Sequence, residues 1–147
     1  MSSPSIRSFE THRFHKGWLI VTAVVIGSFG PVFSLATRAS TSGPARWTLE
    51  LLNGPGGDAE SFAGTTQFLT ALTGGFLFGM GVMVLGLRAW VYDAAPDGVR
   101  RSVVAGLLSW FVLDSAGSIA SGNPWNAFFN VIVLLVAVGP MWRPARG

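Results

Sequence analysis

Residues 17–36 read GWLIVTAVVIGSFGPVFSLA, and this uncharged run decides the fold. A helix that crosses a bilayer needs about 20 mostly apolar residues, because the hydrocarbon core is about 30 Å thick. Working outward, residues 64–90, 102–121 and 124–142 are also long and apolar enough for this role. The sequence therefore predicts an all-α integral membrane protein, a four-transmembrane-helix bundle that forms a single membrane domain over residues 1–147.

The composition supports a membrane location and argues against several other classes. Hydrophobic residues make up 50% of the chain, charged residues only 12%, and the mean hydropathy is +0.49. A soluble domain carries about 25% charged residues. The net charge of +3 is small and the basic residues are dispersed, which argues against nucleic acid as a partner. The partner that the composition predicts is the lipid bilayer.

The ten Lys and Arg residues lie unequally on the two sides of the predicted membrane. Arg38 and Arg46 follow the first span, whereas the other eight lie on the side of the two termini. Those eight are Arg7, Arg13, Lys16, Arg88, Arg100, Arg101, Arg143 and Arg146. The positive-inside rule then predicts a multi-pass protein of the inner (plasma) membrane with both termini cytoplasmic. A cleaved signal peptide is the alternative reading of the N-terminus, but the apolar run exceeds the usual 7–15 residues.

The longest predicted external segment covers residues 37–63. Within it, residues 44–52 read PARWTLELL, a pattern that fits a short helix lying in the membrane interface. Its apolar side would carry Trp47, Leu51 and Leu52. An ordered loop without a role of its own is the other interpretation. The sequence leaves both open, so we expect a short interfacial helix or loop on the outer face.

Asp114 is an acidic residue within a predicted span, and such residues are expensive, so it should face protein partners. The short link at residues 121–123 requires the third and fourth helices to form an antiparallel hairpin. Pairing across this link places Asp114 near Val131, Ser115 near Asn130 and Ser118 near Ala127. A candidate polar pocket in the outer half of the membrane therefore consists of Asp114, Ser118, Asn126, Asn130, Thr66, Thr70 and Thr73.

Two interpretations of these polar residues remain. Polar side chains hold membrane helices together, each hydrogen bond contributing about 0.6 kcal/mol. Intramembrane acids also mark binding sites and ion pathways. In the second case the pocket would open to the outer face and hold a small solute, a cation or a proton.

A separate pattern of small residues predicts close helix packing. Ala71, Gly75 and Gly79 recur at four-residue intervals in the second span. This spacing lets the backbones of two helices approach closely. The partner is either another helix of the same bundle, a second copy of the chain or a different protein.

The sequence contains no recognisable catalytic constellation. His12 and His15, the two histidines, both precede the first apolar run, and there is no cysteine. The G-x-S-x-G, H-E-x-x-H and P-loop motifs are missing. We therefore expect a non-enzymatic protein without a cofactor or metal: an accessory or scaffold subunit, or a homo-oligomer. The alternative is a small-solute or ion-binding or transport protein that uses the pocket around Asp114.

Overall fold

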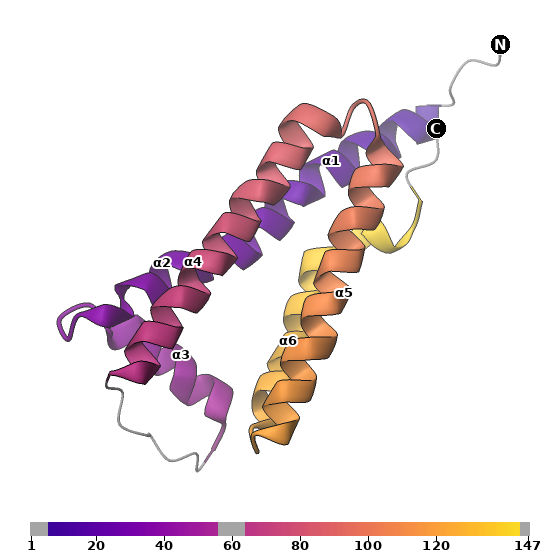
Figure 1. Ribbon diagram of the computed structural model, residues 1–147. Helices are drawn as coiled ribbons and strands as arrows, with labels where there is room; N and C mark the ends of the chain where they lie inside the picture. The colour runs from indigo at the N-terminus through magenta and orange to yellow at the C-terminus, as the bar shows by residue number, and fades with distance from the viewer. Residues whose placement is uncertain (1–5, 56–63, 145–147) are drawn as a thin grey trace.

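The computed structural model describes residues 6–55 and 64–144, and the regular structure within this part of the chain is helical. Figure 1 labels the helices along the chain. The α-helices are α1 (Ile6–Gly27), α2 (Phe29–Ser34), α3 (Gly43–Asn53), α4 (Thr65–Gly86), α5 (Pro96–Ala120) and α6 (Pro124–Val138). Three short helical turns join or end them: η1 (Leu35–Thr37), the π-helical η2 (Leu87–Val91) and η3 (Gly139–Trp142).

Four helical segments are long and apolar enough to cross a membrane, which confirms the predicted number. They are Glu10–Thr37, Thr65–Val91, Pro96–Ala120 and Pro124–Trp142. The first helix begins earlier than the apolar run suggested, because α1 starts at Ile6 and carries both histidines before its apolar part. Residues 56–63 of the predicted external segment lie outside the described residues.

The first span is interrupted between α1 and α2. Pro31 has no N–H, and its ring would clash with the carbonyl of Gly27, the residue four positions earlier. The α-helix accordingly stops at Gly27 and resumes at Phe29. On both sides of the break the span packs against α4, through α1 before it and through α2 after it.

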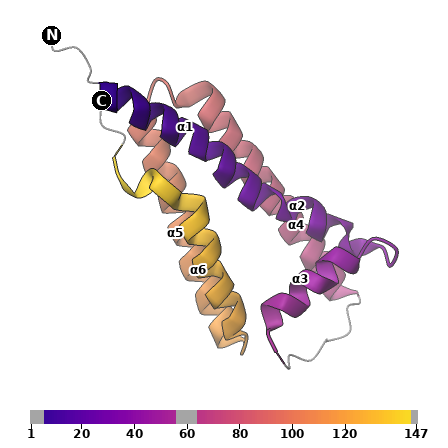
Figure 2. The same cartoon turned by 180° about the vertical axis from the view of Figure 1, so that it is seen from behind.

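The long helices form two pairs that diverge from one end of the molecule (Figures 1 and 2). α4 packs along α1 and α2, and α5 packs along α6, whereas α4 makes few contacts with α5 or α6. The start of α1 and the end of η3 lie at the same end of the molecule, which we call the termini end. At this end, α1, α4, α5 and α6 share a buried core. At the opposite end, α3 lies across the space between the pairs and contacts α6. The arrangement is more open than an evenly packed four-helix bundle.

The packing of α4 against α1 and α2 depends on glycines that let the helix backbones come into contact. A Cβ atom placed on Gly81 would lie 2.8 Å from the Ala23 carbonyl oxygen and 2.9 Å from the Gly27 Cα. A Cβ atom on Gly74 would lie 2.7 Å from the Gly30 carbonyl oxygen. No side chain larger than hydrogen fits at these positions without moving a helix, since real Cβ atoms do not approach backbone so closely.

Residues 44–52, for which the sequence left a helix or a loop open, are helical, as part of α3. Pro44 occupies the first turn, where its missing N–H costs nothing, and Gly54 ends the helix with φ of 75°. Ala45 joins Phe33 and Ala36 in a small second core. Trp47 is 65% exposed.

Candidate functional site

The polar residues of the α5–α6 hairpin form one hydrogen-bonded cluster. We call Asp114, Ser115, Ser118, Asn126 and Asn130 the Asp114 cluster. The Asn130 amide donates to Asp114 Oδ2 at 2.9 Å and to Ser115 Oγ at 3.2 Å. The Asn126 amide donates to Ser118 Oγ at 2.7 Å and to Asp114 Oδ1 at 3.4 Å. Asn130 is only 5% exposed, whereas Asp114 and Asn126 are half-buried.

The hairpin turn fixes which residues of the two helices face each other. Gly122 adopts φ of 81°, a left-handed conformation that favours glycine, and the Asn123 amide donates back to Ser118 O at 2.8 Å. Pro124 then opens α6. Asn123 stands at the N-cap position, but its side chain makes no capping bond. It donates instead to Asn53 Oδ1 at 2.9 Å, and this contact ties the hairpin to α3.

The pairing found across the hairpin differs slightly from simple antiparallel counting. Ser115 faces Asn130, the pairing predicted from the turn. Asp114 also reaches Asn130, rather than Val131, and Ser118 reaches Asn126, rather than Ala127. Side chains tilt along the helix, so a polar atom meets neighbours one position from the residue directly opposite.

The threonines of α4 do not join the Asp114 cluster. Thr70 donates its hydroxyl to Thr66 O at 2.6 Å, and Thr73 donates to Leu69 O at 2.8 Å. Threonine in a membrane helix commonly satisfies its hydroxyl in this way, through the carbonyl one turn earlier. Because α4 packs on α2 and makes few contacts with the hairpin, the expected three-helix pocket contains residues of two helices only.

Both carboxyl oxygens of Asp114 are used as acceptors within the Asp114 cluster. Oδ1 accepts from the Asn126 amide and Oδ2 accepts from the Asn130 amide. Ser118 donates to the Asp114 carbonyl at 2.7 Å, so its hydroxyl is used as well. The cluster can therefore hold the two helices together, and it can also present oxygen atoms to a ligand.

A pocket at the α3 end offers less chemistry. It is lined by apolar surface of Leu51, Pro55, Trp125 and Phe129, together with Gly54 and Glu50. No member of the Asp114 cluster lines it. The polar cluster is therefore the better candidate site.

The small residues at 71, 75 and 79 lie on the free face of α4. A Cβ atom on Gly75 or Gly79 would meet nothing within 4 Å, and both residues are exposed. Ala71 is half-buried. The close contacts with α1 and α2 use Gly74 and Gly81 instead. Packing among the residues that the structure describes therefore does not explain Gly75 and Gly79.

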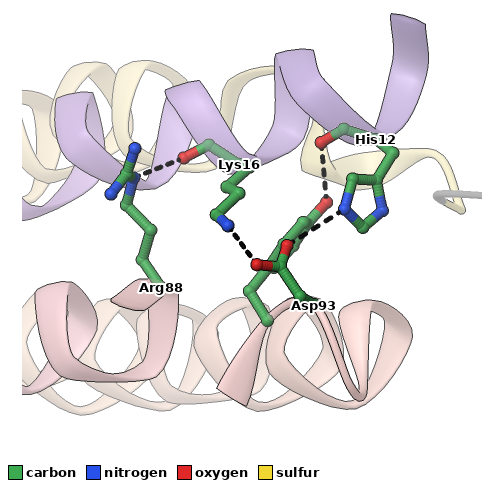
Figure 3. Close-up of polar contacts among 5 residues, drawn as sticks. His12, Lys16, Arg88 and Asp93 are labelled. Atoms are coloured by element: carbon green, nitrogen blue, oxygen red, sulfur yellow. Dashed lines mark hydrogen bonds and ion pairs between the residues drawn. The ribbon is translucent and has the colours of Figure 1, made fainter. Parts of the chain in front are cut away.

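A second polar region, which the sequence reasoning missed, lies at the termini end (Figure 3). Asp93 accepts from Lys16 and pairs with His12 at 3.3 Å. Arg88 donates to the Lys16 carbonyl at 3.0 Å. The hydrogen bond from Lys16, followed by that from His12, holds the pKa of Asp93 below its usual value. These contacts fasten the start of α1 to the segment after α4.

The C-terminal end of α6 is fastened to the same region. Trp18 Nε1 donates to Val136 O at 3.1 Å, and Thr22 donates to Ala137 O at 2.6 Å. These carbonyls have no partner within the helix because they belong to its last turn. Arg100 donates to the carbonyl of Met141 at 3.0 Å. His15 is only 2% exposed in this region, and its Nδ1 has no hydrogen-bond partner.

Tyr92 gives a direct test of this termini-end packing. Its hydroxyl donates to the His12 carbonyl at 3.2 Å, the side chain is 1% exposed, and burial raises the pKa of Tyr92 to about 12. Tyr92 is the one tyrosine in the chain, so phenolate absorbance near 295 nm reports on it alone.

We expect the folded protein to titrate near pH 12 and the denatured chain near pH 10. Because the folded-state pKa is raised, the associated stability is present below about pH 10 and is lost as the pH rises towards 12. Equal midpoints in the folded and denatured states would contradict the packing described for Tyr92.

Comparisons of the chain with protein-family models, with curated proteins and with solved structures gave no match.

Proposed function

We propose that this chain is a non-enzymatic protein of the inner (plasma) membrane that packs against a second copy of itself or another membrane protein through α4. Its role is that of a homo-oligomer or an accessory or scaffold subunit. The observation that carries the proposal is the free glycine face of α4, where Gly75 and Gly79 have open space above them.

Exposed glycine in the middle of a helix needs a reason. It destabilises a helix by about 1 kcal/mol relative to alanine and contributes no apolar surface of its own. Gly74 and Gly81 are explained by the close approach of α1 and α2, whereas Gly75 and Gly79 have no such neighbour within residues 6–55 and 64–144. Small residues four positions apart let a partner helix approach to backbone contact. Their exposed neighbours Phe78 and Val82 are apolar, which suits an interface within the membrane.

The proposed orientation places the termini end in the cytoplasm and α3 on the outer face. The support is the distribution of basic residues together with the position of α3 across the far end of the helices. α3 then lies at the outer surface, with Arg46 and Trp47 exposed, as in an interfacial helix.

Single cysteines test this orientation cleanly, because the chain has none of its own. Ser40 and Ala95 are both exposed and lie towards opposite ends of the helices. In intact cells, a Ser40→Cys variant should react with an impermeant maleimide, and an Ala95→Cys variant should react only after permeabilisation. The reverse pattern would overturn the orientation.

Cross-linking tests the proposed association. In native membranes, a Gly79→Cys variant should form a disulfide-linked dimer, or an adduct with another membrane protein, when an oxidant is added. A disulfide requires the two Cα atoms to lie within about 7 Å, so its yield reports close approach. Val24, which is exposed on α1, supplies the control variant Val24→Cys.

A bulky side chain at the same position should separate the partners. We expect Gly79→Leu to remove most of the complex seen for the wild type in mild detergent. Gly17→Leu is the matched control, because Gly17 is also exposed and has nothing within 4 Å of its Cβ position. If Gly79→Cys cross-links no better than Val24→Cys and Gly79→Leu leaves the complex unchanged, this face of α4 is not an interface.

A further inference from the structure

Asp114 lies within a candidate span and has no cationic partner among the described residues. The ion pairs found in the described part of the chain involve Asp93 and Asp97, and both lie at the termini end. The Asp114 carboxylate instead accepts from two neutral amides. A carboxylate at membrane depth costs about 2.5–3.5 kcal/mol on insertion scales, and neutral donors leave its charge uncompensated.

The two asparagines that donate to Asp114 each carry an amide oxygen that the hairpin does not use. The amide groups of Asn126 and Asn130 donate to the cluster, but their oxygen atoms accept from no described residue. Neither oxygen is sealed from the surface, since the buried unpartnered atoms found among described residues belong to His15 and Asn123. Each carboxylate oxygen of Asp114 also retains a second lone pair.

We propose that the Asp114 cluster binds a small monovalent cation of the sodium class. The ligands are the carboxylate of Asp114 and the amide oxygens of Asn126 and Asn130, and each amide turns so that its oxygen replaces the nitrogen that now faces Asp114. The hydroxyls of Ser115 and Ser118 accept from the same two amides. Carbonyl and carboxylate oxygens are the ligands that hard cations prefer. This site is independent of the association through α4.

The charge of the cluster selects a monovalent ion. The cluster contains one carboxylate and otherwise neutral groups, so a monovalent cation brings its net charge to zero. A divalent cation would leave one positive charge uncompensated in a medium where charge is expensive. A proton would neutralise Asp114 as well, but it would then use one acceptor and leave the amide oxygens without a role.

Carbodiimide labelling tests the proposal on the full-length protein in proteoliposomes. Dicyclohexylcarbodiimide reacts with a protonated carboxyl group in an apolar setting, and a bound cation excludes that proton. The Asp114-containing peptide is followed by mass spectrometry, because other carboxyl groups also react, and an Asp114→Asn variant provides the background. We expect Na⁺ at about ten times its dissociation constant to slow labelling of Asp114 about tenfold, whereas choline at equal ionic strength has no effect.

Two variants connect the protection to the amide and hydroxyl ligands. Asn126→Ala should raise the Na⁺ concentration needed for protection at least about tenfold, as the loss of a group around a metal site does. Ser118→Ala serves as a second variant if the first does not fold. Thr73→Ala is the control, since Thr73 bonds its own helix backbone and lies outside the cluster. In this variant, Na⁺ should protect Asp114 from labelling at the same concentration as in the wild type.

The outcomes separate clearly. Protection by Na⁺ that weakens in Asn126→Ala or Ser118→Ala, but not in Thr73→Ala, supports the cation site. Labelling that no cation slows overturns the proposal and leaves a proton to neutralise Asp114. Protection by Ca²⁺ alone also overturns it. None of these results depends on whether Gly79 mediates association, because the labelling is read at a different helix pair.

Discussion

Replacing Gly81 with valine should lower the free energy of unfolding by about 1–3 kcal/mol, the range for forcing extra atoms into a packed interior. The new Cβ would lie 2.8 Å from the Ala23 carbonyl oxygen and 2.9 Å from the Gly27 Cα, and both are backbone atoms. Backbone cannot rotate away as a side chain can, so α1 and α4 must separate. When the two helices separate, the apolar contacts between α1 and α4 are lost.

Gly106→Val is the matched control for this prediction. Gly106 lies within α5 and has nothing within 4 Å of its Cβ position, so valine there changes helix propensity without a clash. Unfolding of both variants in mixed detergent micelles, followed by circular dichroism, gives the comparison. Equal destabilisation by the two valines would show that α1 and α4 do not meet at Gly81.

The features that could be predicted from sequence depend on local pattern. The four membrane-length helices follow from runs of apolar residues, and the hairpin follows from a link too short for any other connection. The same reasoning placed Asp114 and Asn130 on adjoining helices, where the structure shows a 2.9 Å contact. Each of these inferences needs only the helix repeat and the length of the chain between two positions.

The features that could not be predicted depend on how a helix is rotated about its axis. Gly74, Gly75, Gly79 and Gly81 all lie in α4, and their spacing alone does not say which of them meets a neighbour. The contacts with α1 and α2 fall on Gly74 and Gly81, which leaves the predicted face at Gly75 and Gly79 open. Depth in the membrane alone places the α4 threonines in the predicted pocket, although the hydroxyls of Thr70 and Thr73 bond to the backbone of their own helix.

The network at the termini end was missed for a different reason. Hydropathy counts apolar residues, so it predicts a first span that begins at Gly17. α1 in fact continues back to Ile6, which carries His12 and Lys16 along the same helix to Asp93. A contact between residues 12 and 93 is not visible in any local window of the sequence.

Asp114→Leu should lower the free energy of unfolding by about 1–3 kcal/mol, because it removes one of the two acceptors from each of the amides of Asn126 and Asn130. Asp114→Asn should cost less, since its amide oxygen still accepts from Asn130 and the Asn126 amide can turn its oxygen towards the new N–H group. Both are compared in choline buffer, so that loss of hydrogen bonds is measured without a bound alkali cation.

Thr73→Leu is the control for this series, because it removes a hydroxyl that bonds only the carbonyl of Leu69 on its own helix. We expect it to leave the unfolding midpoint near that of the wild type. In the double variant Asp114→Leu with Asn130→Leu, stability should partly recover, since a buried donor and its acceptor are removed together. If Asp114→Leu is as stable as wild type, the hydrogen bonds of the Asp114 cluster do not hold the hairpin, and the carboxylate must face water or lipid headgroups. If the single variant is destabilised and the double variant recovers, the cost came from stranded amides, and the cluster joins α5 to α6.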